Sequence, residues 1–335
     1  MILVRAPLRI SFVGGGTDLP MFYKQYPGRV ISSSIDKFVY ITINKTQYYG
    51  NKFILKYSQT EGVDRPEELK HTRFRAALQE AGITKGGLEI SSLADLPSGS
   101  GLGSSSSFSC AVIKGLGALQ GKRFSAEELA RKACHLEIDV LGDGIGRQDQ
   151  YASAYGGFNI LQFNSDDTVE VSPIMLNHTD IDDFKKHLLL FYTGMTRQAT
   201  SVLIDQQQNM NDNLDTYKKM SDSVFEFKDK LINKDFPGLG AMLMEGWERK
   251  KSLSGKISGE EIDNLYEIAI KNGAWGGKVL GAGGGGTMLF IAPPEKHSLI
   301  REALKEEALK NNLACFEEID FAFTQSGADV LFNNN

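Results

Sequence analysis

The sequence is poor in the residues that bind zinc or form disulfide bonds. Three cysteines occur in 335 residues, and Cys110, Cys134 and Cys315 are widely spaced, so they form neither a disulfide framework nor a CxxC pair. The five histidines show no HxxxH spacing, which argues against a zinc site. Unpaired cysteines are typical of a reducing compartment, and we therefore expect a cytoplasmic protein.

Long hydrophobic runs and basic segments are also missing. No apolar stretch approaches the ~20 residues that a membrane helix needs. Two arginines interrupt the opening MILVRAPLRI, which therefore does not indicate a secretory signal. The net charge is −5 at pH 7, which argues against nucleic acid or an anionic membrane as the main partner. The sequence leaves the oligomeric state open between a monomer and a homodimer.

Glycine, by contrast, is abundant. The chain contains 35 glycines, about 10% of its residues against a usual ~7%. Many of them gather in three clusters, at Gly14–Gly16, Gly99–Gly103 and Gly281–Gly286. Because glycine lets a backbone adopt unusual angles and approach another group closely, the clusters predict three places where the chain lies against a ligand or another segment.

The hydrophobic pattern predicts helices and strands in mixed order. Alternating, β-branched residues predict a strand at 2–14 that ends at the first glycine cluster. A capping box formed by Ser125 and Glu128 predicts the start of a helix, and a final strand is expected at 315–327. Because the elements do not alternate strictly as βαβ units, we predict two α+β domains that meet near residue 180.

The middle glycine cluster is part of PSGSGLGSSSS, residues 97–107, which lies between a predicted strand and an apolar helical segment. The first turn of a helix offers unpaired N–H groups and a partial positive charge, and small residues before it let phosphate approach them. Hydroxyls in that turn can bind phosphate or Mg²⁺. The segment therefore predicts a phosphate-binding loop, although serines that only cap a helix would give the same pattern.

Two common nucleotide-binding motifs do not fit these glycines. A P-loop requires a lysine directly after its last glycine, and no lysine follows the glycines of residues 97–107. Gly281, Gly283 and Gly286 match GxGxxG, but they precede TMLFIAP, which predicts a strand where a dinucleotide-binding fold requires a helix. These patterns argue against a P-loop NTPase and a Rossmann oxidoreductase.

Together the three glycine segments resemble the motifs of the GHMP kinases, the family named for galactokinase, homoserine, mevalonate and phosphomevalonate kinases. The segments are PLRISFVGGGTD at 7–18, PSGSGLGSSSS at 97–107 and KVLGAGGGG at 278–286. Their order and spacing match, and the resemblance spans essentially the whole chain. The segments GRQDQYA and TGMTRQA resemble the heptose 7-phosphate branch of the family in particular, with L-fucose kinase domains as close relatives.

This resemblance implies a two-domain α+β fold. The N-terminal ATP-binding domain, at 1–180, would be ribosomal protein S5 domain 2-like, and the C-terminal domain, at 181–335, a ferredoxin-like α/β sandwich. The third motif would pack beside the phosphate loop and support it through its backbone. The resemblance also implies ATP as phosphoryl donor and Mg²⁺ as metal.

The resemblance assigns the ATP phosphates to the glycine- and serine-rich loop, and the residues implied are Pro97, Gly99, Ser100, Gly101, Leu102, Gly103, Ser104 and Ser105. It implies Mg²⁺ ligation by the hydroxyl of Ser105, with Ser104 as competitor, and by the carboxylate of Glu137. A carboxylate on a helix is also compatible with simple solvation.

For catalysis the resemblance implies Asp149 as general base for the attacking hydroxyl and Arg9 as the cation that holds it and stabilises transition-state charge. General-base catalysis needs a carboxylate within reach of the acceptor proton. An aspartate in a glycine-rich turn can also serve only to form the turn, so the motif context carries this assignment.

The acceptor site is implied at the end of the first motif, where Thr17 and Asp18 match residues that bind sugar hydroxyls. Gly156 and Gly157 would let the backbone approach the sugar, unless they form a plain turn. Arg197 is the first choice for binding a substrate phosphate, because arginine suits bidentate phosphate contacts. The other cations considered for that role are Lys250, Lys251, Arg29 and Lys37.

The leading hypothesis is therefore an ATP-dependent kinase whose small-molecule partner is a sugar phosphate. It would phosphorylate the anomeric hydroxyl of D-glycero-D-manno-heptose 7-phosphate and supply the 1,7-bisphosphate for nucleotide-heptose synthesis. The alternatives are a kinase for an unphosphorylated monosaccharide such as L-fucose, and a non-catalytic sensor of ATP and sugar. The presence of both Glu137 and Asp149 argues against the sensor.

Overall fold

The computed structural model describes residues 1–335 except 47–49, 51, 196–198, 256 and 335. Its central feature is a pair of long antiparallel strands, β1 (Ile2–Val13) and β2 (Gly28–Lys45). The first residues of β1 alternate between buried and partly exposed positions, whereas its second half is buried throughout. The second half is buried on both faces because helices from the two halves of the chain cover it.

β2 divides the first sheet, because it pairs with β6 (Phe158–Phe163) through its first half and with β5 (Leu88–Ala94) through its second half. The main path of this eight-stranded sheet runs β12-β1-β2-β5-β3-β4, and β6 pairs in turn with β7. The remaining strands are β3 (Phe53–Lys56), β4 (Thr60–Val63), β7 (Val169–Pro173) and β12 (Asp329–Asn333). All pairs are antiparallel except β3 with β5.

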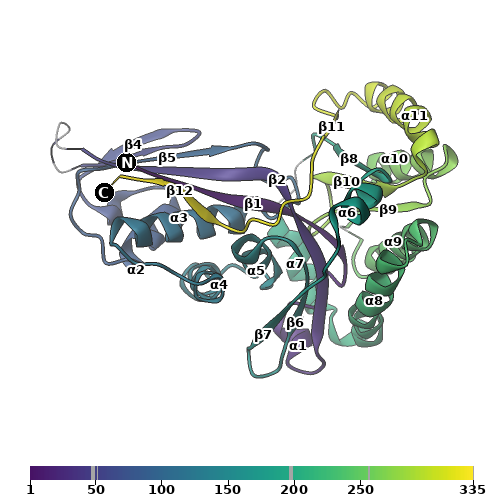
Figure 1. The fold of residues 1–335 in the computed structure, drawn as a ribbon, viewed down its shortest axis with the longest axis horizontal. Helices are drawn as coiled ribbons and strands as arrows, with labels where there is room; N and C mark the ends of the chain where they lie inside the picture. Colours follow the sequence, from purple (N-terminus) through teal and green to yellow (C-terminus); the bar gives the residue numbers. More distant parts are fainter. Residues whose placement is uncertain (47–49, 51, 196–198, 256, 335) are drawn as a thin grey trace.

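The helices of the first half cover one face of this sheet (Figure 1). α3 (Ser104–Leu119) packs on β1 and β2, and the approach is close because a Cβ at Gly115 would lie 2.9 Å from a methyl group of Ile43. Around α3 lie α2 (Thr72–Glu80), α4 (Ala126–Cys134), the π-helix His135–Val140 and α5 (Gln148–Tyr155). The predicted capping box is confirmed, since the Ser125 side chain and the Glu128 side chain each bond the other's backbone N–H.

The second sheet has the antiparallel order β11-β8-β10-β9, from β8 (Leu188–Tyr192), β9 (Gly276–Val279), β10 (Thr287–Ile291) and β11 (Glu317–Glu318). The helices of this half are α6 (His178–Lys185), α7 (Ala199–Gln208), α8 (Leu214–Ile232), α9 (Phe236–Ser252), α10 (Glu260–Lys271) and α11 (His297–Lys310). Strands and helices are thus mixed in both halves, and the predicted α+β class is confirmed.

The two halves share a hydrophobic core. Leu8, Ile10 and Phe12 of β1 belong to one buried cluster with Val224 of α8 and Leu243 of α9. Burial of apolar surface at this junction stabilises the arrangement at ~25 cal/mol per Å². The junction is therefore a packed interface, and it fixes the end of β1 against the helices of the second half.

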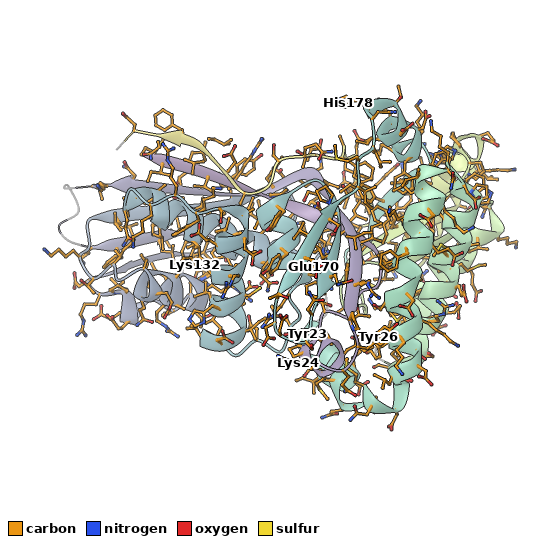
Figure 2. The ribbon with its side chains drawn as sticks, turned by 60° about the horizontal axis from the view of Figure 1, so that its bottom comes forward. Tyr23, Lys24, Tyr26, Lys132, Glu170 and His178 are labelled. Carbon is orange, nitrogen blue, oxygen red and sulfur yellow. The ribbon has the colours of Figure 1, made fainter. Side chains whose placement is uncertain are left out.

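The short helix α1 (Pro20–Tyr23) and the residues after it connect β1 to β2, and their side chains contact both halves of the molecule (Figure 2). The Tyr23 hydroxyl donates to Asp167 at 2.9 Å, and Lys24 pairs with the same carboxylate at 2.6 Å. On the other side, the Tyr26 hydroxyl donates to Asp222 of α8 at 3.0 Å. These contacts hold the segment that follows the first glycine cluster.

The end of the chain differs from expectation. The strand expected at 315–327 is wrong for most of its length, because β11 contains two residues and Phe323 adds an isolated bridge to Ile35. The chain then crosses back to the first half, where β12 pairs with β1 and brings the two termini close together (Figure 1). The domain division at residue 180 stays a prediction, to which the structure adds that β12 belongs to the first sheet.

Candidate active site

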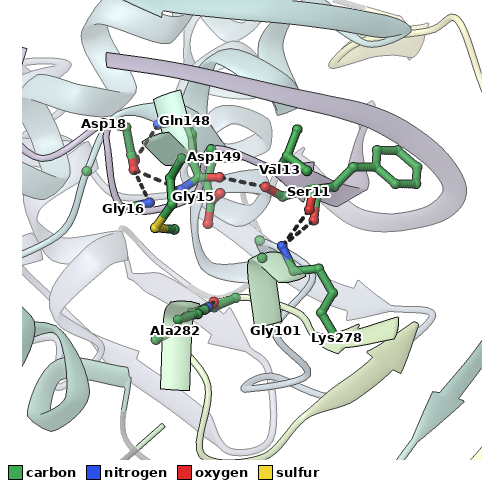
Figure 3. Close-up of a pocket in the computed structure, with 18 of the residues that line it drawn as sticks. Ser11, Val13, Gly15, Gly16, Asp18, Gly101, Gln148, Asp149, Lys278 and Ala282 are labelled. Carbon is green, nitrogen blue, oxygen red and sulfur yellow. Dashed lines mark hydrogen bonds between the residues drawn. The ribbon is translucent and has the colours of Figure 1, made fainter. Parts of the chain in front are cut away.

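A cavity of about 610 Å³ lies between the two halves, and all three glycine segments line it (Figure 3). From the first half it receives residues of β1 and its following turn, the phosphate-binding loop with the start of α3, and the segment before α5. From the second half it receives side chains of α8 and α9 together with Lys278, Gly281 and Ala282. Segments far apart in the sequence therefore meet at one site.

The predicted phosphate-binding loop, Gly99–Gly103, owes its shape to alternating glycines. Gly99, Gly101 and Gly103 have φ angles of 77°, 79° and 78°, a region that residues with a Cβ rarely adopt. The side chains between them, of Ser100 and Leu102, are fully buried. The backbone of the loop is therefore what faces the cavity.

α3 begins directly after this loop, and three serines of its first turn, Ser104, Ser105 and Ser106, line the cavity. Gly103 is the N-cap and offers no side chain, so the first N–H groups of the helix are open to an anion. Of the residues predicted to bind ATP phosphates, Gly99, Gly101 and Gly103 line the cavity with the first two of these serines. Ser100, Leu102 and Pro97 are not among the residues that line it.

The third glycine segment packs directly on the loop. A Cβ at Gly101 would lie 2.6 Å from the carbonyl oxygen of Leu280, and a Cβ at Gly281 would lie 2.8 Å from the Cα of Gly101. Thr287 adds a hydrogen bond from its hydroxyl to the Ser100 carbonyl at 2.7 Å. Both glycines are therefore required by close backbone contact between the two halves.

Arg9 connects Asp149 to the loop. Its Nε donates to Asp149 Oδ1 at 2.8 Å, and Nη2 lies 2.6 Å from the same oxygen. Its Nη1 donates to the Gly101 carbonyl at 2.7 Å. Arg9 is buried, whereas the Asp149 side chain is 27% exposed and lines the cavity. Asp149 also lies in the first turn of α5, where the helix dipole favours a negative charge.

Asp18 is fixed beside Asp149 by three hydrogen bonds (Figure 3). Its carboxylate accepts from the Gly16 N–H at 3.2 Å and from the backbone and side chain of Gln148 at 3.1 and 2.9 Å. A Cβ at Gly146 would overlap this carboxylate, so only glycine fits there. Burial raises the pKa of Asp18, and the nearby charge of Asp149 acts in the same direction.

Thr17, predicted as a sugar-binding residue, is placed differently. Its side chain is fully buried, and its hydroxyl bonds the carbonyls of Gly14 and Arg29, each at 2.8 Å. It also accepts from the Arg29 N–H at 2.9 Å. The structure thus uses Thr17 to hold the glycine turn and leaves Asp18 to line the cavity.

Glu137 is fully buried within the π-helix, a helix type often found at functional sites. Its carboxylate accepts hydrogen bonds from Ser106 at 2.7 Å, Ser109 at 2.8 Å and Gln150 at 2.5 Å. Arg73 forms an ion pair with it at 3.0 Å. Burial raises the pKa of Glu137, while Arg73 opposes that shift.

Ser106 lines the cavity and Glu137, which does not, contacts it from behind; the oxygen atoms of this pair fit magnesium. Ser106 and Glu137 provide oxygen ligands next to the phosphate-binding loop, and Mg²⁺ prefers one or two carboxylates with phosphate and water. No three histidine, cysteine or acidic side chains of the described residues cluster at a metal site, so phosphate oxygens would have to complete the shell. The hydroxyl that contacts Glu137 belongs to Ser106, whereas Ser105, predicted as the ligand, is exposed.

Three buried cations, Arg9, Lys250 and Lys278, lie where the two halves join. Lys278 donates its Nζ to the carbonyls of Ser11 and Phe12 at 3.0 and 2.8 Å (Figure 3), and burial lowers its pKa far below the usual range. Lys250 donates to the Gly281 carbonyl. Burial lowers the pKa of Lys250 to about 8, with the charge of Arg9 acting in the same direction.

Several predicted substrate residues lie away from the cavity. Cβ atoms at Gly156 and Gly157 would meet the Gly327 N–H nitrogen at 2.2 Å and the Gln325 side chain at 2.7 Å, so these glycines seat the returning C-terminal segment and do not approach a sugar in the cavity. Arg197 lies outside the described residues.

The other predicted cations are occupied elsewhere. Lys251 pairs with Glu248 at 2.9 Å and approaches Asp263. Arg29 pairs with Asp222 at 3.2 Å and donates to Gln162. Lys37 lies 3.7 Å from the carboxylate of its neighbour Asp36. None of these three is among the described residues that line the cavity.

Sequence reasoning missed four residues of the site: Arg73, Ser106, Gln148 and Lys278. Ser106 and Gln148 are neighbours of predicted residues in their motifs, so a wider reading of those motifs could have included them. Lys278 is the first residue of the third motif, so the same wider reading could have included it. Arg73 carries no sequence signal, because only the packing of α2 brings it to the cavity.

Comparison with known proteins agrees with this arrangement. Residues 70–157 match the GHMP kinases N terminal domain, and residues 227–311 match the GHMP kinases C terminal domain. The chain belongs to the GHMP kinase family, and it is a sugar kinase that transfers a phosphoryl group from ATP to an alcohol.

Relatives within the family can be named more specifically. The chain is 30% identical to D-glycero-alpha-D-manno-heptose 7-phosphate kinase of Campylobacter jejuni, over 97% of each chain. It is 29% identical to a bifunctional fucokinase/GDP-fucose pyrophosphorylase of Arabidopsis thaliana, over 91% of this chain but 31% of that longer protein. The fold matches the crystal structure of a D-glycero-D-manno-heptose 1-phosphate kinase from Bacteroides thetaiotaomicron with a TM-score of 0.80, 24% identity and full coverage of both chains.

No helix among the described residues combines the length and apolar character that a membrane crossing requires.

Proposed function

We propose that this sugar kinase phosphorylates the anomeric hydroxyl of D-glycero-D-manno-heptose 7-phosphate and forms the 1,7-bisphosphate. The observation that carries the proposal is the 30% identity to the Campylobacter jejuni heptose 7-phosphate kinase over 97% of both chains. The full-length fit to a heptose phosphate kinase structure agrees with it at the level of the fold. Such a product would supply nucleotide-heptose synthesis.

On the donor side, we assign the triphosphate to the loop of Gly99, Gly101 and Gly103 and to the first turn of α3. Backbone N–H groups and serine hydroxyls there can hold phosphate oxygens without a lysine in the loop. Mg²⁺ held by Ser106 and Glu137 would neutralise charge on the phosphates. The Glu137 carboxylate already accepts hydrogen bonds from three neutral side chains and pairs with Arg73. A metal ion would therefore have to replace one of these four partners, most readily the partly exposed Arg73.

On the acceptor side, Asp149 takes the proton from the anomeric hydroxyl as that oxygen attacks the γ-phosphorus. Arg9 fixes the Asp149 carboxylate through Oδ1 and adds positive charge where the transferred group passes. The chemistry asks mainly for positioning and charge stabilisation. Asp18, buried beside Asp149 and held by Gln148, is assigned to a sugar hydroxyl, because a carboxylate accepts such bonds directly.

The phosphate of the acceptor needs cations at the far side of the cavity. Arg197 remains our proposed ligand for it. Lys219 of α8 and Arg249 of α9 line the cavity, although Arg249 also contacts Glu245. These cations support a phosphorylated acceptor over a neutral sugar.

A coupled ADP-release assay over a panel of sugars and sugar phosphates tests the proposal, with NMR of the product to locate the new phosphate. We expect heptose 7-phosphate to give the highest kcat/KM and a product phosphorylated at the anomeric oxygen. A preference for free L-fucose or galactose would overturn the heptose assignment and favour the alternative that the fucokinase relative supports.

A further inference from the structure

The last turn of α9 presents three consecutive cations with different surroundings. Arg249 contacts Glu245, and Lys251 pairs with Glu248. Lys250 between them is buried and donates to the carbonyl of Gly281. Among the residues that the structure describes, no carboxylate forms an ion pair with Lys250.

Lys250 also lies in a field of like charge. Arg9 lowers its pKa, and Lys250 in turn lowers the pKa of Lys278. The acidic group that opposes these effects at Lys250 is Asp18, while Asp149 is already bound by Arg9. Burying cations without matching anions is costly, so this grouping is explained if an anion enters the site.

The position of Lys250 next to the phosphate-binding loop points to a phosphate as that anion. Its carbonyl partner, Gly281, packs against Gly101 of the phosphate-binding loop, and Arg9 donates to the Gly101 carbonyl from the other half. Arg9 and Lys250 therefore approach the same loop from opposite halves of the chain. Lys278, by contrast, uses its ammonium group on the Ser11 and Phe12 carbonyls.

We propose that Lys250 is a catalytic residue whose ammonium group contacts the transferring phosphoryl group, opposite Arg9. In that step the acceptor oxygen forms a bond to the γ-phosphorus, the bond to the β,γ-bridging oxygen breaks, the hydroxyl proton passes to Asp149, and ADP leaves. Negative charge is spread over the three oxygens of the transferred group. Arg9 and Lys250 stabilise it from two sides. The inference rests on phosphoryl transfer at this site and is independent of which sugar is the acceptor.

The test compares Lys250→Met with Lys251→Met, a matched control one residue along the same helix whose ammonium group pairs with Glu248 outside the cavity. Each is assayed with the best acceptor of the wild-type protein. We expect Lys250→Met to lower kcat by roughly 10²–10³-fold with the KM for the acceptor changed less than about threefold. Lys251→Met should keep wild-type kcat.

A pH profile separates catalysis from structure. Because burial lowers the pKa of Lys250 to about 8, the wild-type kcat/KM should fall as pH rises through that value, and this fall should be absent in Lys250→Met. The groups that face Lys250 and could modify this limb are Arg9, Asp18 and Lys278.

Three outcomes would overturn the proposal. One is a kcat for Lys250→Met within threefold of wild type. A second is an increase in the KM for a phosphorylated acceptor alone, which would place Lys250 at the acceptor's own phosphate. The third is a wild-type kcat/KM that stays constant as pH rises above 8, which decides against the proposal without any variant. If Lys250→Met fails to fold, Lys250→Gln replaces it.

Discussion

Asp149 lines the cavity, and Glu137 is buried beside it, in contact with the cavity-lining Ser106; their surroundings give the two carboxylates different capacities. Asp149 is partly exposed, uses one oxygen for Arg9 and lies at the start of a helix, so it can reach an acceptor hydroxyl. Glu137 is buried and bound by Arg73 and the serines of α3, so it can hold a fixed position beside the phosphates. This difference in environment supports our proposal that Asp149 is the proton acceptor and Glu137 a metal ligand.

The substitution Asp149→Asn tests this division of roles. It keeps the shape of the side chain but removes its basicity, so we expect kcat to fall roughly 10²–10⁴-fold with a similar unfolding midpoint. The ADP-release assay and a thermal melt measure the two quantities. Turnover near the wild-type value in the Asn variant would remove Asp149 from the mechanism.

Lys250 allows a prediction about stability. Because burial lowers its pKa from 10.5 to about 8, the folded state binds its proton less tightly than the unfolded state does. Below pH 8 the buried charge therefore costs up to about 3 kcal/mol, and this cost disappears as pH rises toward 10.5. We expect Lys250→Met to be at least as stable as wild type at pH 7, and the wild type to gain stability relative to it between pH 8 and 10.

Urea unfolding at pH 7 and pH 9.5 measures that difference. If Lys250→Met is instead less stable than wild type by more than about 2 kcal/mol at pH 7, the lysine acts through the Gly281 carbonyl as a structural residue.

Some of the individual site residues could be predicted from the sequence, and others could not. The motif resemblance pointed to Arg9, Glu137 and Asp149, and the structure brings all three to one region of the molecule. It pointed to Ser105 as the metal-binding hydroxyl, with Ser104 as competitor, whereas the hydroxyl that contacts Glu137 belongs to Ser106; a motif does not resolve such neighbours, because one residue along a helix turns a side chain by about 100°. It also could not tell that Gly156 packs against Gly327, since a glycine turn does not reveal its neighbour.

At the scale of the elements, the phosphate-binding loop and the third glycine segment form one unit. Gly101 and Gly281 have φ angles of 79° and 73°, and each would clash with the other segment if it carried a Cβ. This unit could be predicted in outline because glycine clusters signal close backbone contact. The final strand could not, because β12 has only five residues and depends on pairing with β1 at the other end of the sequence.

Gly101→Ala tests the unit, with Gly121→Ala as control. Both positions have positive φ, at 79° and 72°, but a Cβ at Gly121 meets nothing within 4 Å. Each variant should lose about 1 kcal/mol of unfolding free energy from backbone strain, and Gly101→Ala should lose more because its Cβ would clash with the Leu280 carbonyl. Only Gly101→Ala should raise the KM for ATP, by tenfold or more, because the loop must shift away from the Leu280 carbonyl. Equal KM values for the two variants would show that the loop contact is unimportant for nucleotide binding.

At the scale of the whole molecule, the site exists because two halves are joined firmly. β1 is buried between the helices of both halves, Lys278 binds its carbonyls from the second sheet, and β12 returns to its edge. The α+β class and the two-part organisation could be predicted from the pattern of helices and strands. The joint itself could not, since it depends on contacts between residues 187 and 267 positions apart.

The most direct test of the account is a crystal structure of the protein with a non-hydrolysable ATP analogue, Mg²⁺ and heptose 7-phosphate. We predict that the triphosphate lies against Gly99–Gly103 and the first turn of α3, with the anomeric hydroxyl within hydrogen-bond reach of Asp149. A triphosphate bound elsewhere, or an acceptor hydroxyl beyond the reach of Asp149, would contradict the account.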